Sequence, residues 1–191
     1  MKPIQRSELL DLGAYEEVRE RFRARVIAVK RARYVALGPA MTLLFENRDT
    51  VLYQVQEMLR TERITQEKAI LHELETYNEL IPGDHELSAT VFVEFPEREE
   101  RERMLVSLAG VEDDFYVLAG DERLAVVPDR RGTDPTRTMA VQYVRFPISS
   151  AAEAALRGGT VTLKVGVDHP AYRAEVALGP ETVASLRDDF E

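Results

Sequence analysis

The sequence predicts an α+β fold, with several helices packed against a mostly antiparallel β-sheet. Helix-like and strand-like segments follow one another in mixed order, and the strand-like segments lie at hairpin spacing, which argues against a doubly wound parallel sheet. The 191 residues, 45% of them hydrophobic and 31% charged, are enough to bury a core, and no change of composition divides the chain. We therefore expect one domain that covers residues 1–191.

A long amphipathic helix is expected near the N-terminus, after a short helix that Ser7 caps and Gly13 ends. Apolar residues recur there every three or four positions, which is the spacing of one buried helix face: Tyr15, Val18, Phe22, Val26 and Val29. A β-hairpin should follow, because two short apolar runs at residues 34–37 and 41–45 flank a Gly-Pro turn.

Two further helices are expected to form a helical hairpin. Asn47 is a good N-cap for a helix over residues 48–63, and Thr65 can cap a second helix that runs through Tyr77 toward the Ile-Pro-Gly stop at residues 81–83. Only two residues separate these helices, so they should pack antiparallel. The core of this region is expected to contain Val18, Phe22, Val26, Val55, Met58 and Leu59.

The second half of the chain is richer in strands. Alternating or β-branched runs predict strands at residues 87–95, 115–119, 124–127, 139–146, 161–167 and 172–178. Three helices are expected in this half. The first covers residues 97–109, the second follows a capping box formed by Ser150 and Glu153, and the third runs from Pro180 onward. The polar loop at 128–135, which contains Gly132, is expected to be the most mobile segment.

Composition excludes several classes of function. The chain has no cysteine, which removes disulfides, thiolate metal sites and thiol nucleophiles. It also lacks a Gly-rich phosphate loop, a Gly-x-Ser-x-Gly elbow and a His-Glu-x-x-His zinc helix. We therefore expect no cofactor and no metal.

The sequence predicts a cytoplasmic location. The N-terminus lacks the apolar stretch of a signal peptide, and no apolar run approaches the ~20 residues that span a bilayer. We expect no contact with a membrane.

Basic charge is concentrated in one segment of an acidic protein. The net charge is −9, yet residues 19–33 carry seven basic residues and one acid: Arg19, Arg21, Arg23, Arg25, Lys30, Arg31 and Arg33 against Glu20. This segment is either a solvated helix face that pairs with the acidic remainder of the protein, or a docking patch for an anionic partner. The overall negative charge disfavours nucleic acid, so a docking patch predicts a protein partner.

The helix after Asn47 contains the densest group of charged residues that could form a site. Glu57, Arg60, Glu62 and Arg63 are spaced for pairing along a helix. An arginine-carboxylate network of this kind can hold an anionic ligand or orient a general acid, and it can also lock two helices together.

Two strand segments supply further candidates. Pro170 forces His169 out of helical angles, which places Asp168 and His169 at a strand end, although neighbours in a strand point to opposite faces. Arg145 lies in a strand that is apolar on both faces, so a buried guanidinium there would need a carboxylate. Glu57 and Glu62 are its expected partners.

Six blocks of sequence, in order along nearly the whole chain, carry a family resemblance. They read LFENRDTV at 44–51, QEM at 56–58 with ER at 62–63, ELIPG at 79–83, LSAT at 87–90, VQYVRF at 141–146 and DHP at 168–170. On these blocks the chain resembles a bacterial family of uncharacterised proteins, domain-of-unknown-function family 3501. The resemblance implies a role beside rubrerythrin-like and iron-sulfur oxidoreductase proteins, where a chain without cysteine would act as an accessory.

The residues leave two hypotheses open. In the first, the protein is a non-catalytic accessory or binding protein that engages a redox partner through the arginine-rich helix or the polar face around Glu57 and Arg60. In the second, it is an enzyme or metal-binding protein in which Glu57, Arg60, Arg63, Arg145 and His169 share one cleft.

Overall fold

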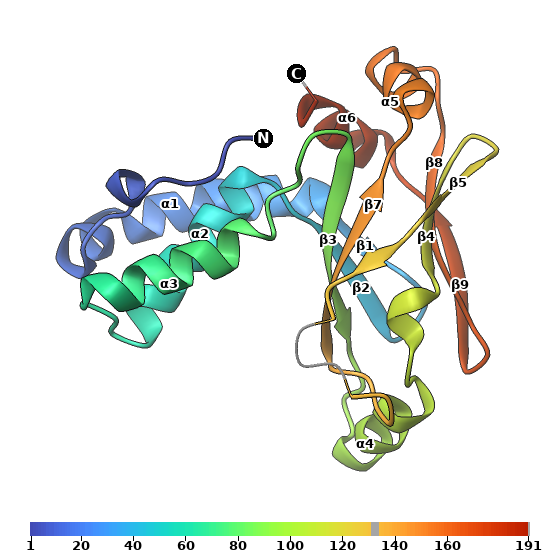
Figure 1. The fold of residues 1–191 in the computed structure, drawn as a ribbon, viewed down its shortest axis with the longest axis horizontal. Coiled ribbons are helices and arrows are strands. Elements are labelled where there is room, and N and C mark those ends of the chain that lie inside the picture. The colour runs from blue at the N-terminus through green and yellow to red at the C-terminus, as the bar shows by residue number, and fades with distance from the viewer. Residues whose placement is uncertain (131–133, 191) are drawn as a thin grey trace.

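A helical arm projects from a β-sheet body in this protein (Figure 1). The computed structural model describes residues 1–130 and 134–190. It confirms the predicted α+β class, and the antiparallel strands divide into two sheets. Gly132, in the loop that was expected to be mobile, lies outside the described residues.

Neighbouring strands are antiparallel in both sheets of the described chain. Sheet A has the strand order β1 (Tyr34–Ala36), β2 (Met41–Phe45), β3 (Glu86–Val93), β7 (Val141–Pro147) and β6 (Val127–Pro128). Sheet B has the order β5 (Glu122–Ala125), β4 (Phe115–Ala119), β8 (Leu163–His169) and β9 (Tyr172–Ala177). Short turns join β1 to β2, β4 to β5 and β8 to β9, as the hairpin spacing predicted.

The two sheets enclose the main hydrophobic core. Leu87, Ala89 and Val91 alternate along β3 and are buried in the same cluster as Val117 and Val165 of sheet B. The intervening residues of β3 therefore point to the outer face of sheet A, away from sheet B.

Tyr172 ties the β1–β2 hairpin to sheet B. Its hydroxyl donates to the carbonyl of Leu37 at 2.6 Å and accepts from the amide of Ala40 at 3.1 Å. Gly38 forms the turn with a φ of +73°, and a Cβ at this position would lie 2.5 Å from the Tyr172 hydroxyl oxygen. Glycine is required here both for its backbone conformation and for the close approach.

Helices cover both ends of the body. They are α4 (Arg98–Ser107) at one end and α5 (Ser150–Arg157) and α6 (Pro180–Asp188) at the other (Figure 1). Ser149, rather than Ser150, caps α5, because its Oγ accepts from the amide of Ala152 at 3.1 Å. Pro180 opens α6 as predicted. A single 3-10 turn, η2 (Val111–Asp113), precedes β4.

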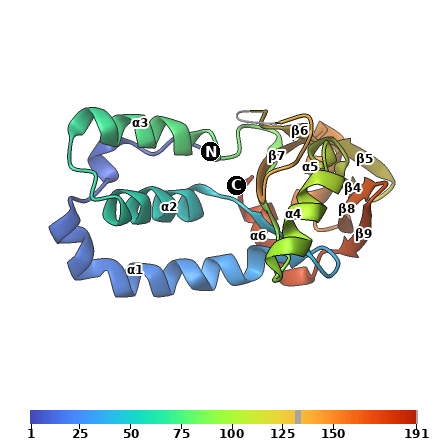
Figure 2. The same ribbon diagram turned by 90° about the horizontal axis from the view of Figure 1, so that it is seen from below.

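Three helices form the arm and lie in a row with α2 in the middle (Figure 2). Their bounds are α1 (Leu12–Arg33), α2 (Arg48–Thr61) and α3 (Glu67–Asn78). The predicted α2–α3 hairpin is present, and Asn47 caps α2 as expected. No helix in the described part of the chain combines the length and apolar composition needed to cross a bilayer.

The beginning of α1 differs from the prediction. The short helix near Ser7 is a single 3-10 turn, η1 (Arg6–Glu8). Asp11 caps α1 by accepting from the amide of Ala14 at 2.9 Å, and the helix then continues through Gly13. An aspartate cap outweighed the low helix propensity of one glycine.

The arm has its own hydrophobic cluster, but α1 contributes less to it than predicted. Of the residues expected in the core, Val26, Val55 and Leu59 are buried, whereas Val18, Phe22 and Met58 are partly exposed. Because α1 lies at the edge of the row, one side of it faces α2 and much of the rest faces solvent (Figure 2).

Arg33, the last residue of α1, is fully buried. Its guanidinium pairs with both carboxylate oxygens of Asp189, just after α6. It also donates to the carbonyl oxygens of Phe45 at 2.8 Å, Glu46 at 3.0 Å and Ser185 at 3.0 Å. The end of α1, the β2–α2 junction and α6 therefore meet at one buried charge.

We predict that Arg33→Met lowers the free energy of unfolding by ~3–5 kcal/mol, because the substitution leaves the Asp189 carboxylate buried without its counterion. Urea denaturation followed by circular dichroism measures this loss. Arg31→Met removes an exposed arginine from the same helix turn and should change stability by less than ~0.5 kcal/mol. Equal, small losses in the two variants would contradict the prediction.

Candidate functional site

Glu57 on α2 joins the two long helices of the arm. Its Oε1 accepts from the Tyr15 hydroxyl at 2.7 Å and from Arg19 Nε at 2.7 Å, and its Oε2 accepts from Arg19 Nη2 at 2.8 Å. The hydrogen bonds from Arg19, followed by that from Tyr15, hold the pKa of Glu57 below its usual range against the effect of burial. Burial and the bond to Glu57 raise the pKa of Tyr15.

The other charged residues predicted on this helix do not join Glu57 in one cluster. Arg60 pairs with Glu16 of α1 at 2.9 Å, which adds a second link between the helices. Glu62 is the C-cap of α2 and is exposed, and Arg63 is exposed with a positive φ of 52°. In the described structure the network of Glu57 and Arg60 locks α2 to α1, which is one of the two roles anticipated for it.

The expected contact of Arg145 with Glu57 or Glu62 is wrong. Arg145 Nη2 donates to the carbonyl of Glu79 at 3.0 Å, and the side chain is only partly buried. Its strand β7 has only the two-residue strand β6 beside it on that edge, so the guanidinium keeps contact with solvent. The carboxylate of Glu57 meanwhile faces α1.

His169 is a structural residue at the end of β8. Its Nδ1 accepts from the amide of Ala171 at 3.1 Å, so Nε2 carries the proton that is directed at the carbonyl of Ala109, 3.3 Å away. Asp168 points to solvent and pairs with Arg173 at 2.9 Å. As the strand periodicity predicted, the two neighbours do not form a dyad.

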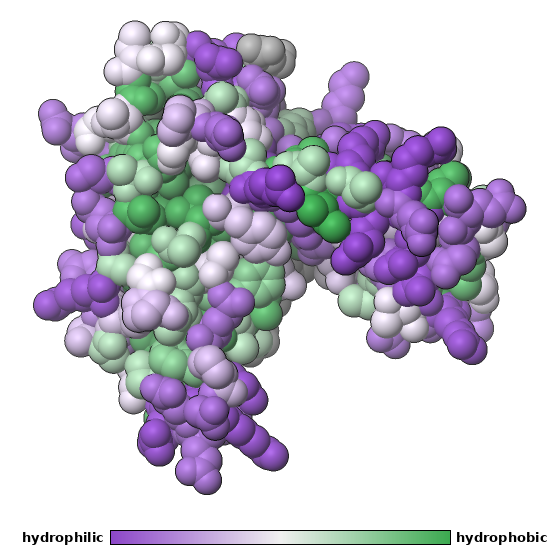
Figure 3. All heavy atoms as spheres, turned by 180° about the vertical axis from the view of Figure 1, so that it is seen from behind, coloured by the Kyte–Doolittle hydropathy of each residue, from purple (hydrophilic) through white to green (hydrophobic). Residues whose placement is uncertain are grey.

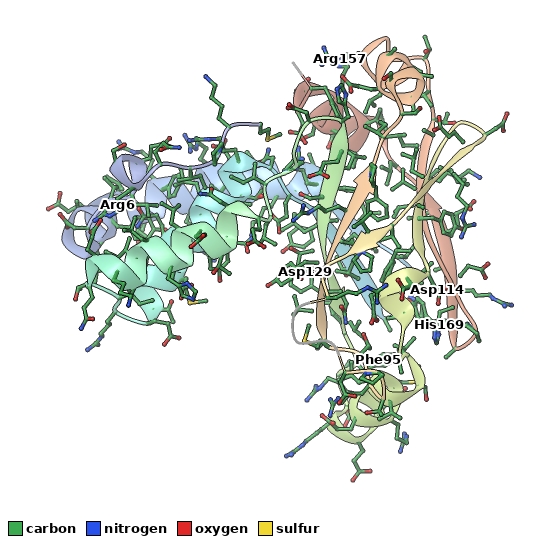
Figure 4. The ribbon with its side chains drawn as sticks, viewed as in Figure 1. Arg6, Phe95, Asp114, Asp129, Arg157 and His169 are labelled. Atoms are coloured by element: carbon green, nitrogen blue, oxygen red, sulfur yellow. The ribbon has the colours of Figure 1, made fainter. Side chains whose placement is uncertain are left out.

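The proposed convergence of Glu57, Arg60, Arg63, Arg145 and His169 in one cleft does not occur. Glu57 and Arg60 lie in the arm and contact α1. Figure 4 shows His169 on the far side of the body, near Asp114, whereas Asp129 lies on the side of sheet A that faces the arm. Within the described residues, no three His, Asp or Glu side chains are grouped closely enough to hold a metal ion.

The arginine-rich segment 19–33 divides into residues bound within the protein and residues that face outward. Arg19 pairs with Glu57, Arg25 lies 3.6 Å from Asp49, and Arg33 is buried against Asp189, so Arg33 cannot belong to a docking surface. Lys30 is half-buried, with its Nζ 5.5 Å from the centre of the Tyr53 ring. Three residues of the segment are exposed and form no ion pair with any described residue: Arg21, Arg23 and Arg31.

An apolar groove of about 430 Å³ runs along the α1–α2 face of the arm. Leu10, Val18, Phe22 and Leu52 form its apolar lining. Its charged lining residues are Arg21, Arg25 and Glu8, and Glu8 is paired with Arg48. Viewed from behind, the arm shows apolar patches between hydrophilic side chains, a broader apolar area lies on the body, and the α4 end of the body is mostly hydrophilic (Figure 3). The groove exists because the predicted apolar stripe of α1 is wider than the surface that α2 covers.

A second hollow, of about 310 Å³, lies on the outer face of sheet A where the body meets the arm. Glu46, Ser88 and Arg145 are among its lining residues, together with Tyr143, Leu80 and the charged residues Glu79, Asp129 and Arg130. Glu46 is only 1% exposed and was missed by the sequence reasoning. The available signal was an acid placed directly between the buried run at 41–45 and the Asn47 cap.

Comparisons with known proteins identify relatives but no activity. The model of the DUF3501 family, described as proteins of unknown function, matches residues 3–190. The crystal structure, at 1.90 Å resolution, of a novel protein of unknown function from Burkholderia pseudomallei K96243 is similar over the full length of both chains, with 36% identity and a TM-score of 0.93. No curated protein matches the chain.

Glu57→Gln should reduce the loss of stability on acidification. The folded pKa of Glu57 lies below the 4.5 of a free glutamate, so its ionisation stabilises the fold above that pH, and this stabilisation is lost as the pH falls through the folded pKa. Urea midpoints measured from neutral to acidic pH test this. Glu62→Gln, which removes an exposed carboxylate at the end of the same helix, is the matched control. Identical pH profiles for wild type and Glu57→Gln would rule out the role given to Glu57.

Proposed function

The chain belongs to the DUF3501 family of proteins of unknown function, and we propose that it is a non-catalytic binding protein whose arm holds an acidic amphipathic helix of a partner protein. The observation that carries this proposal is the apolar groove on α1 and α2, bordered by arginines. Grooves of this kind receive the apolar face of a helix, with side chains at three- and four-residue spacing as anchors.

The floor of the groove supplies the apolar contacts. Val18, Phe22 and Leu52 are partly exposed, and Leu10 is 42% exposed, so a partner helix would remove apolar surface from water at all four positions. Phe22 is held in place by edge contacts with Tyr15 and Tyr53, with ring centroids 6.0 Å apart in each pair. The floor is thus ordered before a partner arrives, which lowers the entropic cost of binding.

The charges around the groove select an acidic partner. Arg21 forms no ion pair with any described residue, and Arg25, stacked 5.1 Å from the Phe22 ring centre, makes only a 3.6 Å contact with Asp49. Both guanidinium groups border the groove and can pair with carboxylates on a partner helix. Arg23 and Arg31 extend the basic surface of α1, which would speed encounter with an acidic partner.

The residues that could carry chemistry lie far apart in the molecule, which supports binding over catalysis. Glu57 and Arg60 form ion pairs between α2 and α1, and His169 forms a hydrogen bond with the backbone of the β8–β9 turn. An enzyme that used these residues would need them in one concave site. The enzyme or metal-binding alternative therefore has no geometric support from the residues that suggested it.

The family resemblance gives the partner class to test first. It implies a cytoplasmic redox partner, either a rubrerythrin-like or an iron-sulfur protein. A chain that has no cysteine would contribute a docking surface to such a pair and no electron-carrying group. Our proposal extends to this partner class, and an acidic helix on the partner is what the groove requires.

A pair of labelled helical peptides tests the groove directly. Both carry leucines at three- and four-residue spacing, and their polar faces carry either glutamate or lysine. We expect the acidic peptide to bind at least about tenfold more tightly than the basic one, a difference of about 1.4 kcal/mol. Fluorescence anisotropy measures both affinities, and added salt should weaken the acidic peptide more.

Matched variants locate the binding surface. Arg21→Glu with Arg25→Glu should weaken the acidic peptide at least about tenfold, because it reverses the charge at the groove. Arg98→Glu with Arg103→Glu makes the same charge change on α4 and should have little effect. Equal binding of the two peptides, or equal effects of the two double variants, would overturn the proposal.

A photoreactive residue at position 22 then identifies the natural partner, and the same residue at position 71 on α3 serves as the control. Crosslinks to a second copy of the chain would favour self-association instead.

A further inference from the structure

The second hollow, on the outer face of sheet A, is built on a row of residues that crosses three chain segments. The amide of Glu46 donates to the carbonyl of Ser88 at 2.9 Å, and Ser88 is paired in register with Arg145. Because Phe45 and Ala89, one position away, are buried between the sheets, Glu46, Ser88 and Arg145 point to the opposite, outer face. We name this hollow the sheet A cleft.

One wall of the sheet A cleft comes from the connection between α3 and β3. Ser88 Oγ donates to the carbonyl of Leu80 at 2.7 Å, and Arg145 Nη2 donates to the carbonyl of Glu79 at 3.0 Å. The cleft holds about 310 Å³, which suits a small molecule and excludes a peptide helix. It is separate in residues and size from the groove of the arm.

Glu46 places a buried negative charge at one end of the cleft. Its Oε1 accepts from Thr90 at 2.6 Å and from Gln54 at 2.9 Å, and its Oε2 accepts from Thr50. All three donors are neutral, and no basic side chain of the described chain lies within ion-pair distance. The charge of Glu46 acts on Lys30 only at longer range. Burial lowers the pKa of Lys30, and the charge of Glu46 partly opposes this lowering. A desolvated carboxylate without a counterion favours a cation in the space beside it.

Arg145 places a positive charge at the other end. The hydrogen bond to the carbonyl of Glu79 uses one of its guanidinium N–H groups, and the side chain forms no ion pair with any described residue. The remaining N–H groups of the guanidinium can donate two parallel hydrogen bonds to a carboxylate. Arg145 and the Glu46 position lie two strand spacings apart, which is roughly 10 Å between backbones.

We propose that the sheet A cleft binds a small zwitterion, with an ammonium group directed at Glu46 and a carboxylate directed at Arg145. The opposite charges at a fixed, short separation define this class, which contains amino acids and short amino-acid derivatives. The Tyr143 ring and Leu80 supply apolar contact between the two ends. This site does not depend on the arm groove, so either proposal can fail without the other.

A homologous series of ω-amino acids, from glycine to aminohexanoate, serves as the set of probes. Isothermal titration calorimetry of the full chain should give saturable binding that is strongest at one chain length, because both charges must be met at once. Hexylamine and hexanoate carry one charge each and should bind at least about tenfold more weakly than the best zwitterion, a difference of about 1.4 kcal/mol.

Three variants assign the two ends. Glu46→Gln and Arg145→Gln should each weaken the best zwitterion at least about tenfold, whereas Arg173→Gln, an exposed arginine on β9, should leave its affinity unchanged. Arg145 is only partly buried, so its variant remains informative if Glu46→Gln fails to fold. Absence of binding by every zwitterion, equal binding of hexylamine, or an unchanged affinity in Arg145→Gln would each overturn the proposal.

Discussion

The buried guanidinium of Arg33 is the constraint on which the arrangement of arm and body depends. It satisfies carbonyl oxygens of Phe45 and Glu46 at the β2–α2 junction and the carboxylate of Asp189 after α6. These bonds fix where α1 enters the body and where α2 leaves it. The position of the arm, and the direction in which the Glu46 side chain points, both follow from that junction. A charge buried this deeply persists only when every donor finds an acceptor in a fixed geometry.

The two proposed binding surfaces arise from one feature of the architecture, an arm that is one helix layer thick. A layer of this kind cannot bury the full apolar stripe of its edge helix, so part of α1 remains exposed beside α2 (Figure 2). Where the layer meets the body, the connection from α3 to β3 overhangs the outer face of sheet A and leaves a hollow there. The sequence places arginines beside the first surface and opposite charges at the two ends of the second.

The sequence predicted the elements well because they depend on local signals, and it predicted the sites poorly because they depend on pairing across the chain. The apolar stripe of α1, the Asn47 cap and the turn glycines each act within a few residues. Arg33 and Arg21 look alike in sequence, yet one is buried and the other exposed. Only the packing of α6 against α1 separates them. Arg145 likewise faces Glu79 rather than the helix carboxylates because of strand order, which the chain does not encode locally.

The pairing of Arg33 with Asp189 also bears on how the protein is made. These residues are 156 positions apart, so the guanidinium at the end of α1 cannot meet its carboxylate until nearly the whole described chain has left the ribosome. Until then, the junction between arm and body carries an unpaired cation at a position that is buried from solvent in the folded protein. The arm helices can form early from local contacts, but their docking must wait for α6. The step that fixes the two parts relative to each other thus follows the synthesis of α6 and Asp189.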